Sequence, residues 1–140
     1  MSERTLRLAS AVVAALGVAI TAYLFYVRQT GGAPVCSTGG CETVQKSAYA
    51  EVLGVPVAAL GLVAFLGLLL TAIARGEWAR LSQVTLALSA LVFSAYLLYI
   101  QLAVIDAICQ WCLAADVLTI AIVALGFARL RVGDTRTRVT

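Results

Sequence analysis

The sequence predicts an all-α integral membrane protein: a bundle of four transmembrane helices with a glycine-rich outer loop between the first and second. Of its 140 residues, 62% are hydrophobic and 12% are charged, which is too little charge to cover a soluble domain. A hydrocarbon core about 30 Å thick needs roughly 20 apolar residues per helix. Stretches of that length cover residues 8–27, 52–74, 81–105 and 108–128. We therefore expect one membrane domain over residues 1–140, with any soluble partner on another chain.

The first apolar stretch follows a short basic segment, as a cleaved signal peptide would. The apolar region of a signal peptide spans about 7–15 residues, whereas residues 8–27 form a longer run. This run ends in Tyr23, Phe25 and Tyr26, followed by Arg28, and it contains no small-residue cleavage site. We interpret it as a retained first helix.

The connections between the apolar stretches differ in length. The loop over residues 28–51 is long and contains Gly31, Gly32, Pro34, Gly39 and Gly40. By contrast, Asp106 and Ala107 form a minimal turn, and the connection around residues 76–78 is also short. Short connections favour antiparallel neighbouring helices. Most aromatic residues near the membrane surfaces, including Tyr23 and Trp111, are assigned to an interfacial belt without chemistry.

The positions of lysine and arginine predict the orientation, because cytoplasmic loops carry an excess of both. With the N-terminus inside, only Arg28 and Lys46 of the ten basic residues lie outside. The other eight are Arg4, Arg7, Arg75, Arg80, Arg129, Arg131, Arg136 and Arg138. We expect a multi-pass protein of the cell (inner) membrane with both termini cytoplasmic. The tail over residues 129–140 then faces anionic lipid, and no nucleic-acid partner is expected.

All four cysteines fall on the outer side of this topology, where disulfides persist. Cys36 and Cys41 lie in the glycine-rich loop, whereas Cys109 and Cys112 lie where the fourth helix begins. A spacing of three places two side chains on one face of a helix. The helix N-terminus stabilises a thiolate, so Cys109 and Cys112 form a redox-competent pair. The glycines around the loop pair let it move between two positions.

Other uses of the cysteines compete with redox chemistry. Two disulfides could staple the loops of a non-enzymatic tetraspan, although a short CxxC loop gains little from closure. Structural zinc usually joins two similar knuckles of a soluble module. Soft thiolates bind Cu(I) and similar metals, but a metal carrier needs ligands inside its helices, and the chain has no histidine and only Met1 as methionine. We favour thiol–disulfide chemistry with no resident metal, and keep the heavy-metal carrier and the stapled tetraspan as alternatives.

An ordered set of motifs resembles the bacterial homologues of vitamin K epoxide reductase over nearly the full chain. The set comprises the loop cysteines, Ser47 in CETVQKSAYA, the segment LGVPVAALG, and the CxxC that opens the fourth helix. The resemblance implies a membrane disulfide-generating oxidoreductase that passes electrons to a quinone, menaquinone or ubiquinone. Some bacterial members carry a fused thioredoxin-like domain. None is expected here, so the redox partner should be a separate extracytoplasmic thioredoxin-fold protein.

The resemblance also implies roles for individual cysteines. Cys109 and Cys112 look like the active-site pair, with Cys112 nearer the quinone. Cys36 and Cys41 look like the shuttle pair that exchanges with the soluble partner.

Two polar residues look like neighbours of the quinone. Ser47 looks like the hydroxyl that borders its pocket. Asp116, one turn below Cys112, departs from the animal enzymes, which have an aromatic residue there, and this weakens the expectation of vitamin K epoxide chemistry. An ionisable residue inside a membrane is a functional candidate, so Asp116 is either a proton donor to the quinone or an interfacial charge near the helix N-terminus.

Overall fold

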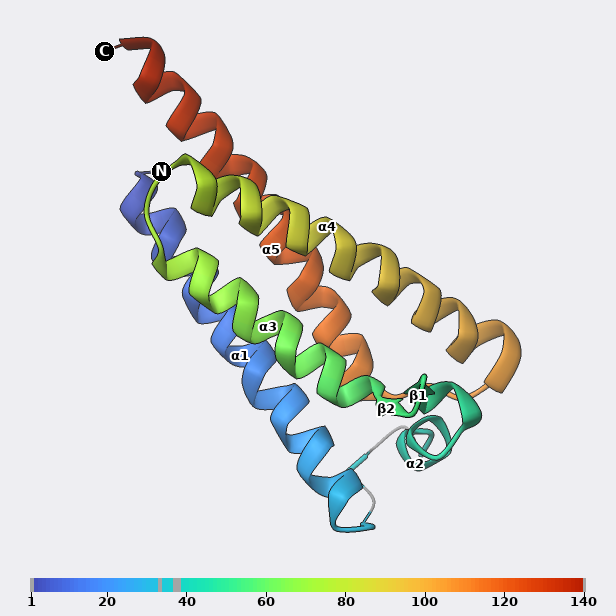
Figure 1. The fold of residues 1–140 in the computed structure, drawn as a ribbon. Helices are drawn as coiled ribbons and strands as arrows, with labels where there is room; N and C mark the ends of the chain where they lie inside the picture. Colours follow the sequence, from blue (N-terminus) through green and yellow to red (C-terminus); the bar gives the residue numbers. More distant parts are fainter. Residues whose placement is uncertain (1, 33, 37–38, 140) are drawn as a thin grey trace.

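The computed structural model describes residues 2–32, 34–36 and 39–139, and four long helices dominate it (Figure 1). These are α1 (Glu3–Gln29), α3 (Val57–Ile73), α4 (Glu77–Tyr99) and α5 (Gln110–Val139). Between α1 and α3 lie the short helix α2 (Cys41–Gln45), the 3-10 turn η1 (Ala48–Ala50), and the strands β1 (Glu51–Val52) and β2 (Val55–Pro56). The strands pair as an antiparallel hairpin. A π-helical turn, η2 (Ile100–Ile105), extends α4.

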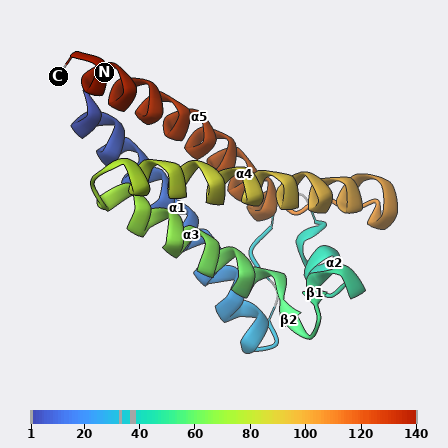
Figure 2. The same cartoon turned by 45° about the horizontal axis from the view of Figure 1, so that its top comes forward.

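The helices form a closed bundle, in which α1 and α4 each pack against both α3 and α5. A turned view shows the same arrangement (Figure 2). Its core contains Ala14, Phe65, Leu68, Ala87 and Ile122. Gly17 allows the close approach of α1 and α3, because a Cβ atom there would lie 2.2 Å from the Phe65 ring. Small residues at such contacts are the usual means of packing helices in lipid.

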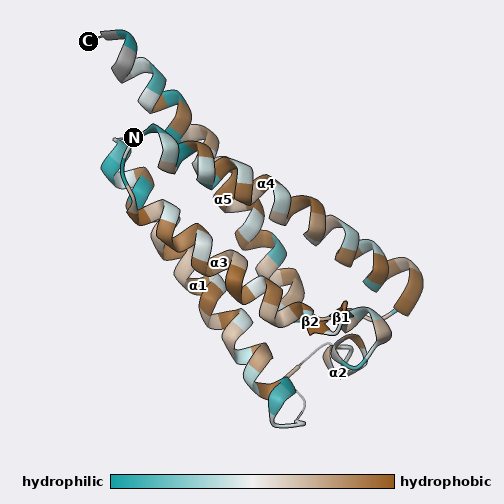
Figure 3. Ribbon diagram, in the orientation of Figure 1, coloured by the Kyte–Doolittle hydropathy of each residue, from teal (hydrophilic) through white to brown (hydrophobic). Residues whose placement is uncertain are grey.

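The outward faces of the helices are apolar (Figure 3). Large hydrophobic side chains such as Val12, Leu70 and Val92 are 60%, 68% and 72% exposed. Three helical stretches are long and apolar enough to cross a membrane, and α3 is a shorter apolar helix of 17 residues. At about 1.5 Å per residue, α3 is still about 25 Å long. The prediction of an all-α membrane bundle is confirmed.

The helix bounds differ from the predicted stretches. The second stretch, 52–74, begins too early, because residues 51–56 form the β1–β2 hairpin with Leu53 at a positive φ of 53°. The helices expected at 8–27 and 81–105 start earlier, at Glu3 and Glu77. The fourth does not end at residue 128, because α5 continues to Val139. The predicted tail is therefore mostly a helical extension, since nothing between residues 128 and 139 breaks the helix.

A buried polar network joins the four helices at the end of the bundle that holds both termini. The guanidinium of Arg129 on α5 is fully buried, rather than lying in an exposed tail. It donates to Gln83 Oε1 on α4 and to the carbonyl oxygens of Thr71 (3.1 Å) and Ala74 (3.3 Å) at the end of α3. Gln83 Nε2 in turn donates to Ser10 Oγ of α1 at 3.1 Å. This network fixes the four helices relative to one another far from the cysteines.

Candidate active site

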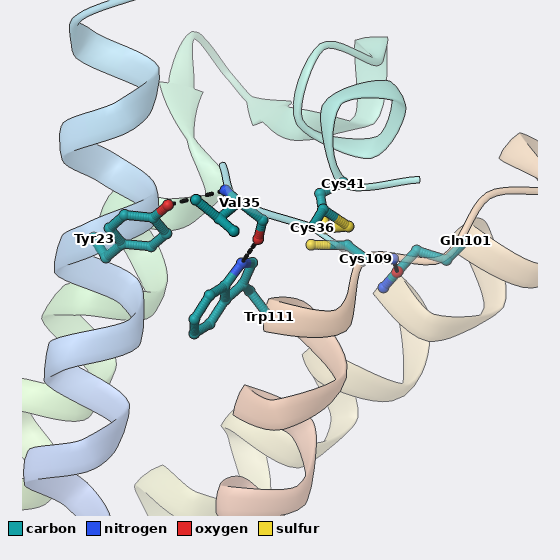
Figure 4. Close-up of a disulfide and its surroundings, with 7 residues drawn as sticks. All are labelled: Tyr23, Val35, Cys36, Cys41, Gln101, Cys109 and Trp111. Atoms are coloured by element: carbon teal, nitrogen blue, oxygen red, sulfur yellow. Dashed lines mark hydrogen bonds between the residues drawn. A yellow bond between two sulfur atoms is a disulfide. The ribbon is translucent and has the colours of Figure 1, made fainter. Parts of the chain in front are cut away.

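Both cysteine pairs lie together at the end of the bundle opposite the termini (Figures 1 and 4). Cys36 and Cys41 form a disulfide with their Cα atoms 6.0 Å apart. Cys109 and Cys112 lie outside this disulfide, and Cys112 is half-buried. The Cys109 sulfur points toward the loop disulfide (Figure 4), and Cys41 and Cys109 are both fully buried. A thiol and a disulfide in this arrangement can exchange without exposing either buried sulfur to water.

The first turn of α5 positions the helix pair. The Cys109 carbonyl accepts a 3.0 Å hydrogen bond from the Leu113 amide, so Cys109 caps the helix and Cys112 falls in its first turn. The Cys109 amide donates to the buried Gln101 Oε1 at 2.9 Å. Gln101 belongs to the π-helical turn η2, and such turns often occur at functional sites. We did not predict this role for Gln101, whose only signal was an amide within an apolar stretch.

The loop docks closely on the segment that precedes α5. A Cβ atom on Gly40 would lie 2.4 Å from the backbone oxygen of Ile108 and 2.7 Å from its nitrogen. Only glycine fits at that separation, because neither backbone atom can move aside as a flexible side chain would. Gly40 precedes Cys41 and Ile108 precedes Cys109, so this contact holds the two buried cysteines side by side.

Two aromatic residues hold the other side of the loop. The Val35 amide donates to the Tyr23 hydroxyl oxygen at 3.0 Å, and Trp111 Nε1 donates to the Val35 carbonyl oxygen at 2.6 Å (Figure 4). The two rings also contact each other, with centroids 5.2 Å apart. The backbone next to Cys36 is thereby tied to α1 and α5. The assignment of Tyr23 and Trp111 to an interfacial belt overlooked this clamp, which residues far apart in the sequence create.

A cavity of about 150 Å³ lies beside the helix pair. Cys112 lines it together with Ser47, Ser94 and Asp116. The rest of its wall is mainly apolar and includes Leu24, Phe65, Phe93 and Leu97. The residues that the sequence analysis expects near a quinone, Ser47, Cys112 and Asp116, therefore line one common cavity.

The polar groups of the cavity differ in whether they remain free to form a hydrogen bond with a ligand. Asp116 Oδ2 is buried and makes no hydrogen bond, although the Ser94 hydroxyl lies within reach of the carboxyl group. Ser47 Oγ donates to the Val44 carbonyl oxygen at 2.8 Å. Ser47 thus presents lone pairs to the cavity in this arrangement, rather than the proton that a donor to the quinone would need.

The cavity matches the chemistry of a quinone. Its apolar wall suits a ring and an isoprenoid tail, while its few polar groups suit the ring oxygens. The Asp116 oxygen without a hydrogen bond can hold a proton and donate it to a ring oxygen, which is an acceptor. Among the residues that the structure describes, no group of three or more histidine, cysteine, aspartate or glutamate side chains could hold a metal ion.

The sequence matches a model of the vitamin K epoxide reductase family over residues 8–127, from α1 into α5. The match covers most of the chain, and it confirms the resemblance drawn from the cysteine motifs. Proteins of this family use quinones as electron partners. The chain therefore belongs to the vitamin K epoxide reductase family and is a membrane thiol–disulfide oxidoreductase.

Proposed function

We propose that this protein oxidises a separate thioredoxin-fold protein outside the cytoplasmic membrane and passes the electrons to a membrane quinone. The observation that carries the proposal is the order of the groups in space. Cys109 lies beside the loop disulfide (Figure 4), and Cys112, which lies in the first turn of the same helix, lines the apolar cavity. A dithiol relay needs this order, because each sulfur exchanges only with the next.

The first exchange takes place at the loop. A thiolate of the reduced partner attacks Cys36, which is less buried than Cys41, and the Cys36–Cys41 bond breaks to give a mixed disulfide. The partner's second thiol then displaces Cys36. The partner leaves with a disulfide, and Cys36 and Cys41 remain as two thiols, so two electrons and two protons have entered the relay.

The second exchange takes place between the loop and α5. The Cys41 thiolate attacks Cys109 of a Cys109–Cys112 disulfide and releases Cys112. Cys36 then attacks Cys41, which restores the loop disulfide and leaves Cys109 and Cys112 as thiols.

The final step transfers electrons and protons from Cys109 and Cys112 to the quinone in the cavity. A quinone bound there accepts two electrons and two protons, which re-forms the Cys109–Cys112 disulfide. Cys112 is the sulfur that lines the cavity. Asp116 Oδ2, which is buried and makes no hydrogen bond, holds and transfers a proton, as general acid–base groups do. The Ser47 hydroxyl donates to the Val44 carbonyl oxygen, so its lone pairs can accept a hydrogen bond from the quinol that this transfer forms.

The basic residues support an orientation with the cysteines outside. Eight of the ten lysine and arginine residues lie toward the end of the bundle opposite the cysteines, which is the cytoplasmic end under the positive-inside rule. A membrane-impermeant thiol reagent should label Cys36, which is partly exposed, in intact, reduced cells, whereas Cys41 and Cys109 are buried. If labelling requires permeabilised cells, the orientation is reversed and the extracytoplasmic partner is wrong.

Quinone reduction by the purified protein tests the function directly. The reaction contains a reduced thioredoxin-fold donor, and either menaquinone or ubiquinone. We expect quinol to form in step with donor disulfide, and substitution of Cys109 by alanine to abolish both. Donor oxidation without quinol would refute the proposal. Metal content is measured in the same preparation, because stoichiometric copper or zinc with no turnover would favour the metal carrier instead.

A further inference from the structure

A large cleft opens at the end of the bundle far from the cysteines. Its volume is about 890 Å³. The first turns of α1, the end of α3, the α3–α4 turn and the start of α4 form its walls, together with Gly133 of α5. Four arginine side chains line it: Arg4, Arg7, Arg75 and Arg80. No step of the redox relay uses this cleft.

The cleft carries an excess of positive charge. Glu3 is the one carboxylate on its wall within the described part of the chain, and it pairs with Arg80 at 3.2 Å. Arg7 donates through Nη2 to the Ile73 carbonyl oxygen, which carries no charge, and its Nε is buried and makes no hydrogen bond. Arg4, Arg7 and Arg75 thus line the cleft without an ion-pair partner among the residues that the structure describes. Such a set suits a phosphate group, which arginine binds through paired N–H donors.

One wall of the cleft is apolar and continues onto the lipid-facing surface. It is formed by Leu8, Ala11, Ala72 and Ile73. Leu8 and Ile73 are 59% and 56% exposed, so the hydrocarbon chains of the membrane reach them directly. A free phosphate ion makes no use of such a wall, whereas an acyl chain next to a phosphate does.

We propose that this cleft binds one anionic phospholipid, with its headgroup phosphate among Arg4, Arg7 and Arg75 and its acyl chains along Leu8 and Ile73. Basic pockets between transmembrane helices are typical sites for anionic headgroups. The lipid phosphate supplies a counter-charge for these arginine side chains. The site is independent of the proposed redox relay.

The test uses the full chain in a mild detergent and titrates it with dioleoyl-phosphatidylglycerol, while native mass spectrometry counts bound lipids. Dioleoyl-phosphatidylcholine has the same chains and no net charge, and inorganic phosphate has the charge without chains. We expect one phosphatidylglycerol per protein, much weaker binding of phosphatidylcholine, and no displacement by millimolar phosphate.

A double variant, Arg4→Gln with Arg75→Gln, locates the site. Both side chains are exposed, so their loss should leave the thermal unfolding midpoint unchanged. Two headgroup contacts are worth about a 30-fold loss of affinity for phosphatidylglycerol. The matched control is Arg131→Gln with Arg138→Gln, which removes the same charge from α5 outside the cleft and should leave the affinity unchanged.

Three results would overturn the proposal. Equal binding of the two lipids would show that the cleft does not distinguish headgroups by their net charge. An equal loss of affinity in the control variant would show a diffuse attraction to basic residues rather than a site. Displacement of the lipid by inorganic phosphate would assign the cleft to a soluble anion. None of these outcomes bears on quinone reduction, which is measured separately. Failure of the lipid proposal would therefore leave the redox proposal unchanged.

Discussion

Replacement of Gly40 by alanine should separate the two buried cysteines without touching either. The added Cβ atom would lie 2.4 Å from the Ile108 oxygen, and ordinary contact begins at 3.4 Å. The loop must therefore retreat by about 1 Å from the start of α5, because both contacting groups are backbone. A displacement of that size between reacting groups can lower a rate by about 100-fold. Gly40→Ala should consequently slow exchange between Cys41 and Cys109 by about that factor.

Rapid mixing followed by acid quench and thiol alkylation measures this step. The protein starts with the helix pair oxidised, a reduced donor is added, and the alkylated cysteines are counted by mass spectrometry. In Gly40→Ala the loop thiols should accumulate before those of Cys109 and Cys112 appear. The first exchange, between the donor and Cys36, should keep its rate, because Val35 remains clamped by α1 and α5.

Gly32→Ala is the matched control. Gly32 lies in the same loop, and a Cβ atom there meets nothing closer than 3.8 Å. Its backbone is also outside the left-handed region, so alanine introduces no strain. This control should behave as the unmodified protein does. If the rate of exchange between Cys41 and Cys109 in Gly40→Ala lies within about twofold of the rate in Gly32→Ala, the close docking of the loop on Ile108 does not limit the relay.

Three further predictions concern the relay, the cavity and the clamp. In Cys112→Ala, Cys109 can still attack Cys41 of the loop disulfide and release Cys36, but no Cys112 thiol remains to take over Cys109. A Cys41–Cys109 bridge should therefore accumulate in a non-reducing digest, whereas a Cys36–Cys109 bridge would reverse the order of the loop cysteines. Asp116→Asn keeps the shape and removes the ionisable group, so quinone reduction should fall by about 100-fold or more; an unchanged rate and pH profile would reduce Asp116 to a surface charge. Trp111→Phe keeps the ring and loses the 2.6 Å hydrogen bond to the Val35 carbonyl. That loss is worth about 1 kcal/mol, so hydrogen exchange at the amides of Val35 and Cys36 should be about fivefold faster. Unchanged exchange would show that the bond does not hold the loop.

The architecture was predictable because it depends on properties that a sequence displays directly. Long apolar runs separated by short turns determine the number of helices and make neighbours antiparallel. The residues at which the helices begin and end were harder to predict from the sequence. The apolar residues Val52, Leu53 and Val55 continue the pattern of the second helix, and only the backbone reversal at Leu53 separates the hairpin from α3.

The chemistry of the site was visible in part. The cysteines and their spacing identify the redox pairs, and the family resemblance supplied Ser47 and Asp116. The residues that position them were not visible. Gln101 meets the Cys109 amide because a π-helical turn shifts its register, and the Gly40 contact exists only once the loop lies against Ile108. Such roles arise from tertiary contacts, which neither periodicity nor composition encodes.

The buried guanidinium of Arg129 has a consequence for how the protein is made. Its acceptors belong to the end of α3 and to Gln83 of α4, so α5 by itself offers none of them. An arginine facing hydrocarbon without partners is costly. We therefore expect the last helix to reach its final position after α3 and α4 have come together to supply these acceptors. Because the CxxC begins the same helix, the placement of the redox pair beside the loop would then depend on packing at the opposite end of the bundle.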